Sequence, residues 1–126
     1  MRYSRRKKVK PQPSFDKGFT YVANPYSSSD PDLMHTRYER TAAFVAKRMR
    51  KGEVLYSPIV HHHQMAIDHK LPTDWPFWRN IDGTMLAAAK RLTVLKLTGW
   101  EKSVGVQAEI AIALARNIPV EYAEPV

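Results

Sequence analysis

The chain has 126 residues and is 44% hydrophobic, which suits one domain with an apolar core and excludes a wholly disordered protein. The absence of cysteine excludes disulfides, thiolate metal sites and a cysteine nucleophile. No run of about 18 apolar residues is present, and no apolar segment follows the basic N-terminus, so we expect neither a membrane span nor a secretory signal but a cytoplasmic protein.

The net charge of +8 is concentrated at the N-terminus. Residues 1–17 hold seven of the 20 basic groups and one of the 12 acidic groups, which leaves 13 basic and 11 acidic groups in residues 18–126. We therefore predict a flexible basic arm over residues 1–17, with at most weak contact to nucleic acid, and a nearly neutral domain over residues 18–126.

The first half of the domain opens with an apolar run over residues 19–23 that stops at Asn24-Pro25, which predicts a buried strand and a turn. Asp30-Pro31-Asp32 then combines a capping side chain, an early proline and an acid in the first turn, and so predicts a helix that ends at Gly52. We predict a second strand over residues 54–56. A long loop over residues 59–74, which holds three consecutive histidines, is expected to follow.

The second half continues the alternation, with a helix over residues 76–90, a strand over 92–97, a helix capped by Ser103 and a strand over 118–122. This order predicts an α/β fold of Rossmann or flavodoxin type: a parallel sheet of four to five strands with helices on both faces. In such folds ligands bind at the carboxyl ends of the strands. We therefore expect a site formed by three loops, at residues 24–29, 58–63 and 98–103.

The last of these loops carries two chemically suggestive features. Ser103-Val104-Gly105 places a hydroxyl and free amides at a helix N-terminus, which suits an anion and equally suits an ordinary serine cap. Glu109 follows in the same helix among small and apolar residues, where an unpaired carboxylate is costly. It therefore lies either in a cleft or on a solvated face.

The stretch from Ser103 to Ala113 resembles the signature S/D-x-G-x-x-x-E-x-x-x-A of the nucleoside 2-deoxyribosyltransferase superfamily. The segment from Tyr21 to Tyr26 is similar to the first strand and loop of that superfamily, and Asp82 matches its acid before the third strand. The likeness is greatest to an uncharacterised phage and bacterial subgroup with the patterns S-P-I-x-H, L-P-x-D-W-x-F-W and G-W-E-x-S-x-G-V. The resemblance as a whole covers residues 18–125.

The resemblance implies an enzyme in which Glu109 attacks the anomeric carbon of a sugar to form a glycosyl ester. Asp82 then protonates or orients the leaving base, and Tyr21 orients the glutamate or the sugar. Nucleoside transferases carry Asp where this chain has Ser103. The deoxynucleoside 5′-monophosphate N-hydrolases carry Ser, so the resemblance implies a nucleotide substrate bound at Ser103 and Gly105.

Several other side chains are candidates for substrate contact: Asn24, Tyr26, Ser27, Arg37, His61 and Trp100. We expect no cofactor and no metal, because neighbouring histidine side chains on an extended loop diverge. The alternatives are a deoxyribosyltransferase, a nucleotide-binding module without turnover, and a nucleic-acid-associated protein that depends on its arm. The resemblance further implies a homo-oligomer in the cytoplasm of a bacterium or a phage-infected host.

Overall fold

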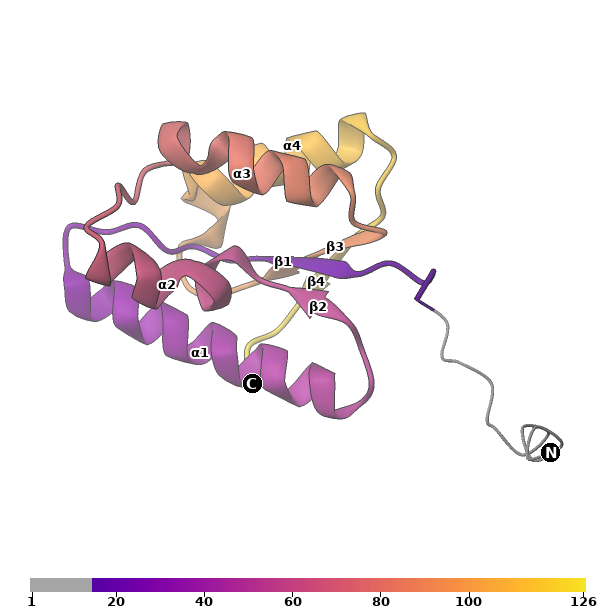
Figure 1. The fold of residues 1–126 in the computed structure, drawn as a ribbon, viewed down its shortest axis with the longest axis horizontal. Coiled ribbons are helices and arrows are strands. Elements are labelled where there is room, and N and C mark those ends of the chain that lie inside the picture. The colour runs from indigo at the N-terminus through magenta and orange to yellow at the C-terminus, as the bar shows by residue number, and fades with distance from the viewer. Residues whose placement is uncertain (1–14) are drawn as a thin grey trace, which may run out of the picture.

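Four parallel strands form a single sheet in the computed structural model, which describes residues 15–126 (Figure 1). The strands lie in the order β2-β1-β3-β4, so the two central strands are β1 and β3. Their bounds are β1 Thr20–Ala23, β2 Leu55–Tyr56, β3 Arg91–Leu95 and β4 Val120–Ala123. In the register, Tyr21 of β1 pairs with Tyr56 of β2 and with Leu92 of β3.

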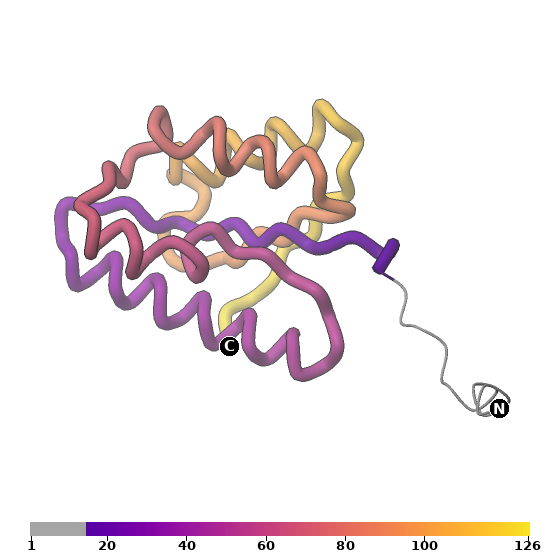
Figure 2. Tube along the Cα trace, viewed as in Figure 1, coloured from indigo at the N-terminus to yellow at the C-terminus, as the bar shows by residue number. Residues whose placement is uncertain are grey.

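The helices cover both faces of this sheet, as Figures 1 and 2 show. One side carries α1 (Pro31–Arg50) with α2 (Pro58–Asp68) packed against it. The other side carries α3 (Trp75–Ala87) and α4 (Val104–Ala115), which pack against each other, and the 3-10 turn η2 (Trp100–Lys102) leads into α4. The predicted α/β fold with a parallel sheet and helices on both faces is therefore confirmed.

Alternation along the strands divides the core into two halves. Tyr21 and Ala23 of β1 join the apolar cluster under α3 and α4, whereas Val22 joins the cluster under α1. Strand β3 alternates in the same way, because Leu92 and Val94 lie in the first cluster and Leu95 in the second. Both faces are thus buried, as a doubly covered parallel sheet requires.

The prediction of a long loop over residues 59–74 is wrong, because most of this segment forms helix α2. The Ser57 side chain caps this helix by accepting a hydrogen bond from the Val60 amide, 3.1 Å away, and Pro58 occupies the first position. Ser57-Pro58 therefore does what Asp30-Pro31 does for α1, where the Asp30 side chain accepts from the Asp32 amide. Proline at position 58 starts a helix as well as ending a strand.

The other elements lie near their predicted positions. Helix α3 ends at Ala87 and not at residue 90, and β4 runs from Val120 to Ala123 and not over residues 118–122. Gly52 follows α1 with a φ of +90°, the left-handed conformation expected of a glycine after a helix. The predicted arm lies outside the described residues except for its last three positions. Within residues 15–126, no helix has the length and apolarity needed to span a bilayer.

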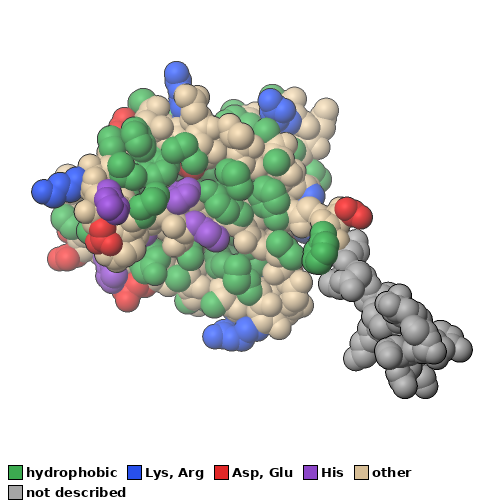
Figure 3. All heavy atoms as spheres, viewed as in Figure 1, with side chains coloured by type: hydrophobic (Ala, Val, Ile, Leu, Met, Phe, Trp, Pro, Cys, Tyr) green, Lys and Arg blue, Asp and Glu red, His purple; other side chains and the backbone are tan. Residues whose placement is uncertain are grey.

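Some large apolar side chains remain outside the core. Met65 and Ile67 of α2 and Phe77 and Ile81 of α3 are exposed. Figure 3 shows hydrophobic side chains gathered over these two helices, with histidines among them. Apolar surface of this kind is typical of interaction sites. The expected homo-oligomer stays a prediction, which light scattering of the protein in solution would test.

Candidate active site

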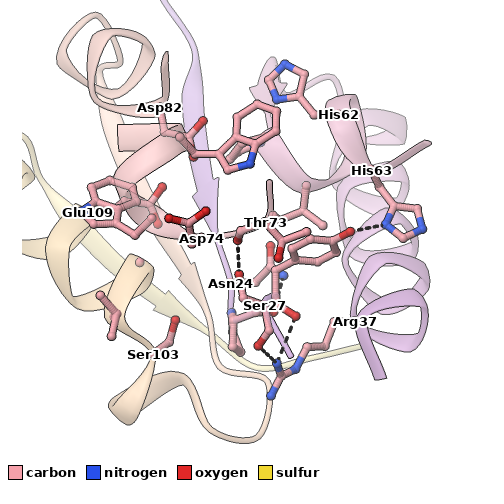
Figure 4. A pocket seen from close by; sticks show the side chains of 18 of the residues that line it. Asn24, Ser27, Arg37, His62, His63, Thr73, Asp74, Asp82, Ser103 and Glu109 are labelled. Carbon is pink, nitrogen blue, oxygen red and sulfur yellow. Dashed lines mark hydrogen bonds between the residues drawn. The ribbon is translucent and has the colours of Figure 1, made fainter. Parts of the chain in front are cut away.

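A cavity of about 660 Å³ opens at the carboxyl ends of the central strands (Figure 4). Its volume lies within the roughly 300–1,000 Å³ typical of small-molecule sites. The wall is built by the loop after β1, the inner side of α2, the start of α3, and the segment from Gly99 into α4. Loops 24–29 and 98–103, which the sequence predicts to meet, thus lie on one cavity, and α2 takes the place of the third loop.

Glu109 forms part of this wall from the interior of α4. Its side chain is only 5% exposed, and the Tyr21 hydroxyl donates a hydrogen bond to its Oε2. Burial raises the pKa of Glu109 to about 8; the bond from Tyr21 lowers this pKa and the nearby Asp82 carboxyl raises it. Glu109 therefore lies in the cleft and not on a solvated face.

Asp82 supplies a second buried carboxyl from α3. It is 7% exposed, and burial raises its pKa to about 7. Tyr56 is near both carboxyls, since its own pKa is raised to about 12 by burial and by the charges of Asp82 and Glu109. The structure thus brings Glu109, Asp82 and Tyr21 together. Two carboxyl groups with raised pKa values in a cleft are suited to nucleophilic and acid–base chemistry.

Three buried side-chain atoms lack a hydrogen-bond partner within residues 15–126, and all three belong to residues that line the cavity. They are Oδ1 of Asn24, Nδ1 of His62 and Oδ1 of Asp82. Buried polar atoms are nearly always hydrogen-bonded in native proteins, and those that are not typically mark a functional site or missing solvent. All three atoms are therefore available for hydrogen bonds to molecules that enter the cavity.

The N-terminus of α4 faces the same cavity. The Ser103 side chain accepts a hydrogen bond from the Val106 amide at 3.3 Å and so caps the helix, while the amides of Val104 and Gly105 precede the first intrahelical bond. Gly105 lies close to Trp75, because a Cβ at this glycine would meet the indole at 3.8 Å. Lys102 adds a cation to this side of the cavity.

The loop after β1 is held by the predicted residue Arg37. Its Nη1 donates to the carbonyls of Tyr26 and Ser27, both at 3.1 Å, so this nitrogen supports the loop. Its Nη2 lies beside Gly99 and makes no hydrogen bond within residues 15–126. Four residues predicted to contact substrate thus line the cavity: Asn24, Tyr26 and Ser27 of the loop and Arg37 of α1.

Two residues predicted to contact substrate lie away from the cavity wall. His61 is exposed and packs beside Tyr56, and its Nδ1 lies 2.8 Å from the carbonyl of Ser57. Trp100 packs against Tyr122 and the core under α3 and α4. Neither lines the cavity. His61 lies off the cavity wall because it belongs to helix α2, in which the side chains of consecutive residues point in directions about 100° apart.

The next two histidines do line the cavity, and sequence reasoning assigned them no role. His62 stacks on Trp78, with ring centroids 5.1 Å apart, and His63 is hydrogen-bonded through Nδ1 to the Tyr26 hydroxyl at 2.6 Å. Burial and the neighbouring His61 lower the pKa of His62, so we expect a neutral ring at neutral pH. Within residues 15–126 no three His, Asp or Glu side chains are grouped so that they could hold a metal ion.

The start of α3 also contributes Asp74, Trp75 and Trp78 to the cavity wall, whereas the sequence favours packing roles for Trp75 and Trp78 and a substrate contact for Trp100. They belong to the stretch from Leu71 to Trp78, which carries one of the three subgroup patterns. Of the three tryptophans, Trp75 and Trp78 line the cavity and Trp100 does not. Only the contacts between α3 and the other elements could have shown this.

The sequence of residues 18–124 matches the family described as "Domain of unknown function (DUF1937)". Because the match covers most of the chain, the chain belongs to this family. No curated protein matches the sequence.

Proposed function

We propose that this DUF1937 protein is an N-glycosidase that cleaves the N-glycosidic bond of a deoxynucleoside or nucleoside 5′-monophosphate through a covalent glycosyl-glutamate intermediate. One observation carries the proposal: Glu109 lies buried on the cavity wall, accepts a hydrogen bond from Tyr21 and is close enough to Asp82 for their charges to interact. The resemblance to the nucleoside 2-deoxyribosyltransferase superfamily supports the same roles for these three residues.

In the first step the Glu109 carboxylate attacks C1′ of the sugar and forms an ester while the bond from C1′ to the base nitrogen breaks. The electron pair of that bond leaves with the base, and protonated Asp82 gives the base a proton. Water then attacks C1′, Asp82 takes its proton, and the ester bond to Glu109 breaks. One water is consumed, the base and the sugar 5-phosphate are released, and both carboxyls return to their starting states.

The 5′-phosphate would lie at the opposite end of the cavity from Asp82. The Ser103 hydroxyl, the free amides of α4 and Lys102 are donors on that side, and the positive end of the helix dipole favours an anion there. Trp75 and Trp78 provide aromatic faces for packing against a base. The cavity would thus offer the phosphate an end rich in hydrogen-bond donors, and the base an end with aromatic side chains and a carboxyl group.

The test is the release of free base from each deoxynucleoside and nucleoside 5′-monophosphate, followed by chromatography. We expect release by the natural protein and a loss of at least about 1,000-fold in Glu109→Gln, because the nucleophile is gone. Glu101→Gln is the matched control, since this glutamate is exposed and lies outside the cavity wall. Equal rates in Glu109→Gln and the natural protein would exclude the glycosyl-glutamate mechanism.

A second candidate is a nucleotide-binding module without turnover. The observation that favours it is the raised pKa of Glu109, about 8, which leaves the free protein mostly protonated at this group at pH 7. A protonated carboxyl is a poor nucleophile. Calorimetry that shows binding of the same 5′-monophosphates, with no base released between pH 6 and 9, would favour this candidate over the enzyme.

A further inference from the structure

Residues 73–75 form part of the cavity wall and contact both the loop after β1 and the first turn of α4. The Ser27 hydroxyl, in the loop after β1, donates a hydrogen bond to the carbonyl of Thr73. At the other side Trp75 lies against Gly105 in the first turn of α4. Asp74 lies in the sequence between these two contacts, and its exposed side chain lines the cavity.

Asp74 occupies the N-cap position of α3, yet its side chain makes no capping hydrogen bond. The N-cap side chains of α1, α2 and α4 all make one. Such a bond is worth about 1 kcal/mol. The Asp74 carboxylate also has no hydrogen bond or ion pair with another residue of the described part of the chain. Figure 4 shows it projecting into the cavity on the side of Glu109.

We propose that Asp74 is a specificity-determining residue that binds the 3′-hydroxyl of the substrate sugar and so restricts the site to monomeric nucleotides with a free 3′-hydroxyl. The inference rests on the proposed function, because that function places the sugar beside Glu109. A carboxylate without a partner in the fold readily accepts a hydrogen bond from a sugar hydroxyl. In a 2′-deoxynucleotide the 3′-hydroxyl is the sugar donor that remains once C1′ faces Glu109 and the 5′-phosphate lies at the N-terminus of α4.

Charge gives this arrangement its selectivity. A phosphate on the 3′-oxygen would remove the hydroxyl proton and bring a second anion against the Asp74 carboxylate. The same penalty applies to a nucleotide inside a nucleic acid strand, whose 3′-oxygen is esterified to phosphate. The residue would therefore select mononucleotides against polynucleotides.

The experiment compares 2′-deoxynucleoside 5′-monophosphates with the corresponding 3′,5′-bisphosphates in the natural protein, Asp74→Asn and Asp30→Asn. We expect kcat/KM of the natural protein to be at least about 100-fold lower for the bisphosphates, and this ratio to fall below about tenfold in Asp74→Asn. Asp30 is the matched control, an N-cap aspartate that does cap its helix and lies outside the cavity wall. Asp30→Asn should keep the ratio.

Thermal unfolding separates selectivity from folding. Because the Asp74 carboxylate has no partner in the fold, Asp74→Asn should unfold within about 1 °C of the natural protein. A large loss of Tm in Asp74→Asn would show that the carboxylate serves the fold, and would overturn the inference. An unchanged discrimination ratio in Asp74→Asn would also overturn it, while base release from the monophosphates would leave the proposed function standing.

Calorimetry with the same two compounds decides the case in which no base is released. Binding of the monophosphate, exclusion of the bisphosphate and loss of that difference in Asp74→Asn would support the role of Asp74 although the glycosidase reaction had failed. Equal binding of both compounds by the natural protein would overturn the role of Asp74. Binding of neither compound would overturn both the inference and the nucleotide site.

Discussion

At the scale of single residues, the pair Glu109 and Asp82 predicts the pH dependence of the reaction. Burial raises the pKa values of these carboxyls to about 8 and about 7. The pair therefore holds two protons in acid, one between these values and none above them, and such coupled groups titrate as a unit. The reaction needs the one-proton form in which Glu109 is ionised and Asp82 is protonated; this is the minor one-proton form of the free protein, because the higher pKa of Glu109 places the proton mainly on Glu109.

We therefore predict a bell-shaped profile of kcat/KM with its maximum between about pH 7 and 8. The rate falls on the acid side because Glu109 is protonated, and on the alkaline side because Asp82 has lost the proton that the base requires. Asp82→Asn should lower the rate by about 100-fold or more and abolish the alkaline limb. A profile that is flat from pH 6 to 9 in the natural protein would contradict the assignment.

At the scale of elements, two serines cap two helices in the same way. Ser57 accepts a hydrogen bond from the Val60 amide at 3.1 Å, and Ser103 accepts one from the Val106 amide at 3.3 Å. Only Ser103 lines the cavity. The two positions therefore separate the structural role of a serine cap from a role in substrate binding.

We predict that Ser57→Ala and Ser103→Ala each lose about 1 kcal/mol of stability, because each removes one cap. Only Ser103→Ala should also raise KM for a 5′-monophosphate, by about tenfold, since a hydrogen bond to a charged phosphate is lost. Thermal unfolding and initial rates measure the two effects. A similar KM increase in both variants would assign the effect to helix destabilisation and remove Ser103 from the phosphate site.

At the scale of the whole molecule, the buried carboxyls lower the stability of the fold as pH rises. The pKa of Glu109 is about 8 in the folded chain and near its ordinary value in the unfolded chain. Below the ordinary value both states are protonated and nothing is lost. Between that value and pH 8 the unfolded chain releases a proton that the folded chain retains, so stability declines.

Glu109→Gln removes this decline, since an amide does not ionise. We predict that the substitution raises Tm by about 4–8 °C at pH 8.5, equivalent to roughly 1–2 kcal/mol, and by much less at pH 5. Circular dichroism at the two pH values measures the difference, with Glu101→Gln as the exposed control. An equal gain at both values would mean that ionisation of Glu109 does not carry the effect.

Local sequence patterns predict several strands and helices of this fold. Alternation of apolar residues and the cap at Asp30 predict the sheet and α1 correctly, because these patterns follow from backbone geometry. Ser57-Pro58 carries the same kind of signal at the start of α2, but a proline directly after an apolar run equally predicts the end of a strand, so the local pattern does not predict this helix.

In the candidate site, too, a sequence pattern identifies some residues, and only contacts distant in the sequence identify others. Glu109, Asp82 and Tyr21 were found through a motif, and the structure brings them together. Asp74 could not be found, because an aspartate at the start of a helix predicts a cap. Its position in the cavity depends on contacts of its neighbours with Ser27 and Gly105, which are distant in the sequence.

The position of Tyr21 links the chemistry to the register of the sheet. This tyrosine is fully buried in central strand β1, and its hydroxyl reaches Glu109 because odd-numbered residues of that strand face α3 and α4. Inserting or deleting one residue at the start of β1 would turn Tyr21 toward α1 and present a neighbour to the glutamate. The geometry of the proposed nucleophile thus depends on strand pairing, and a sheet that slipped by one residue would lose that geometry even if it still packed.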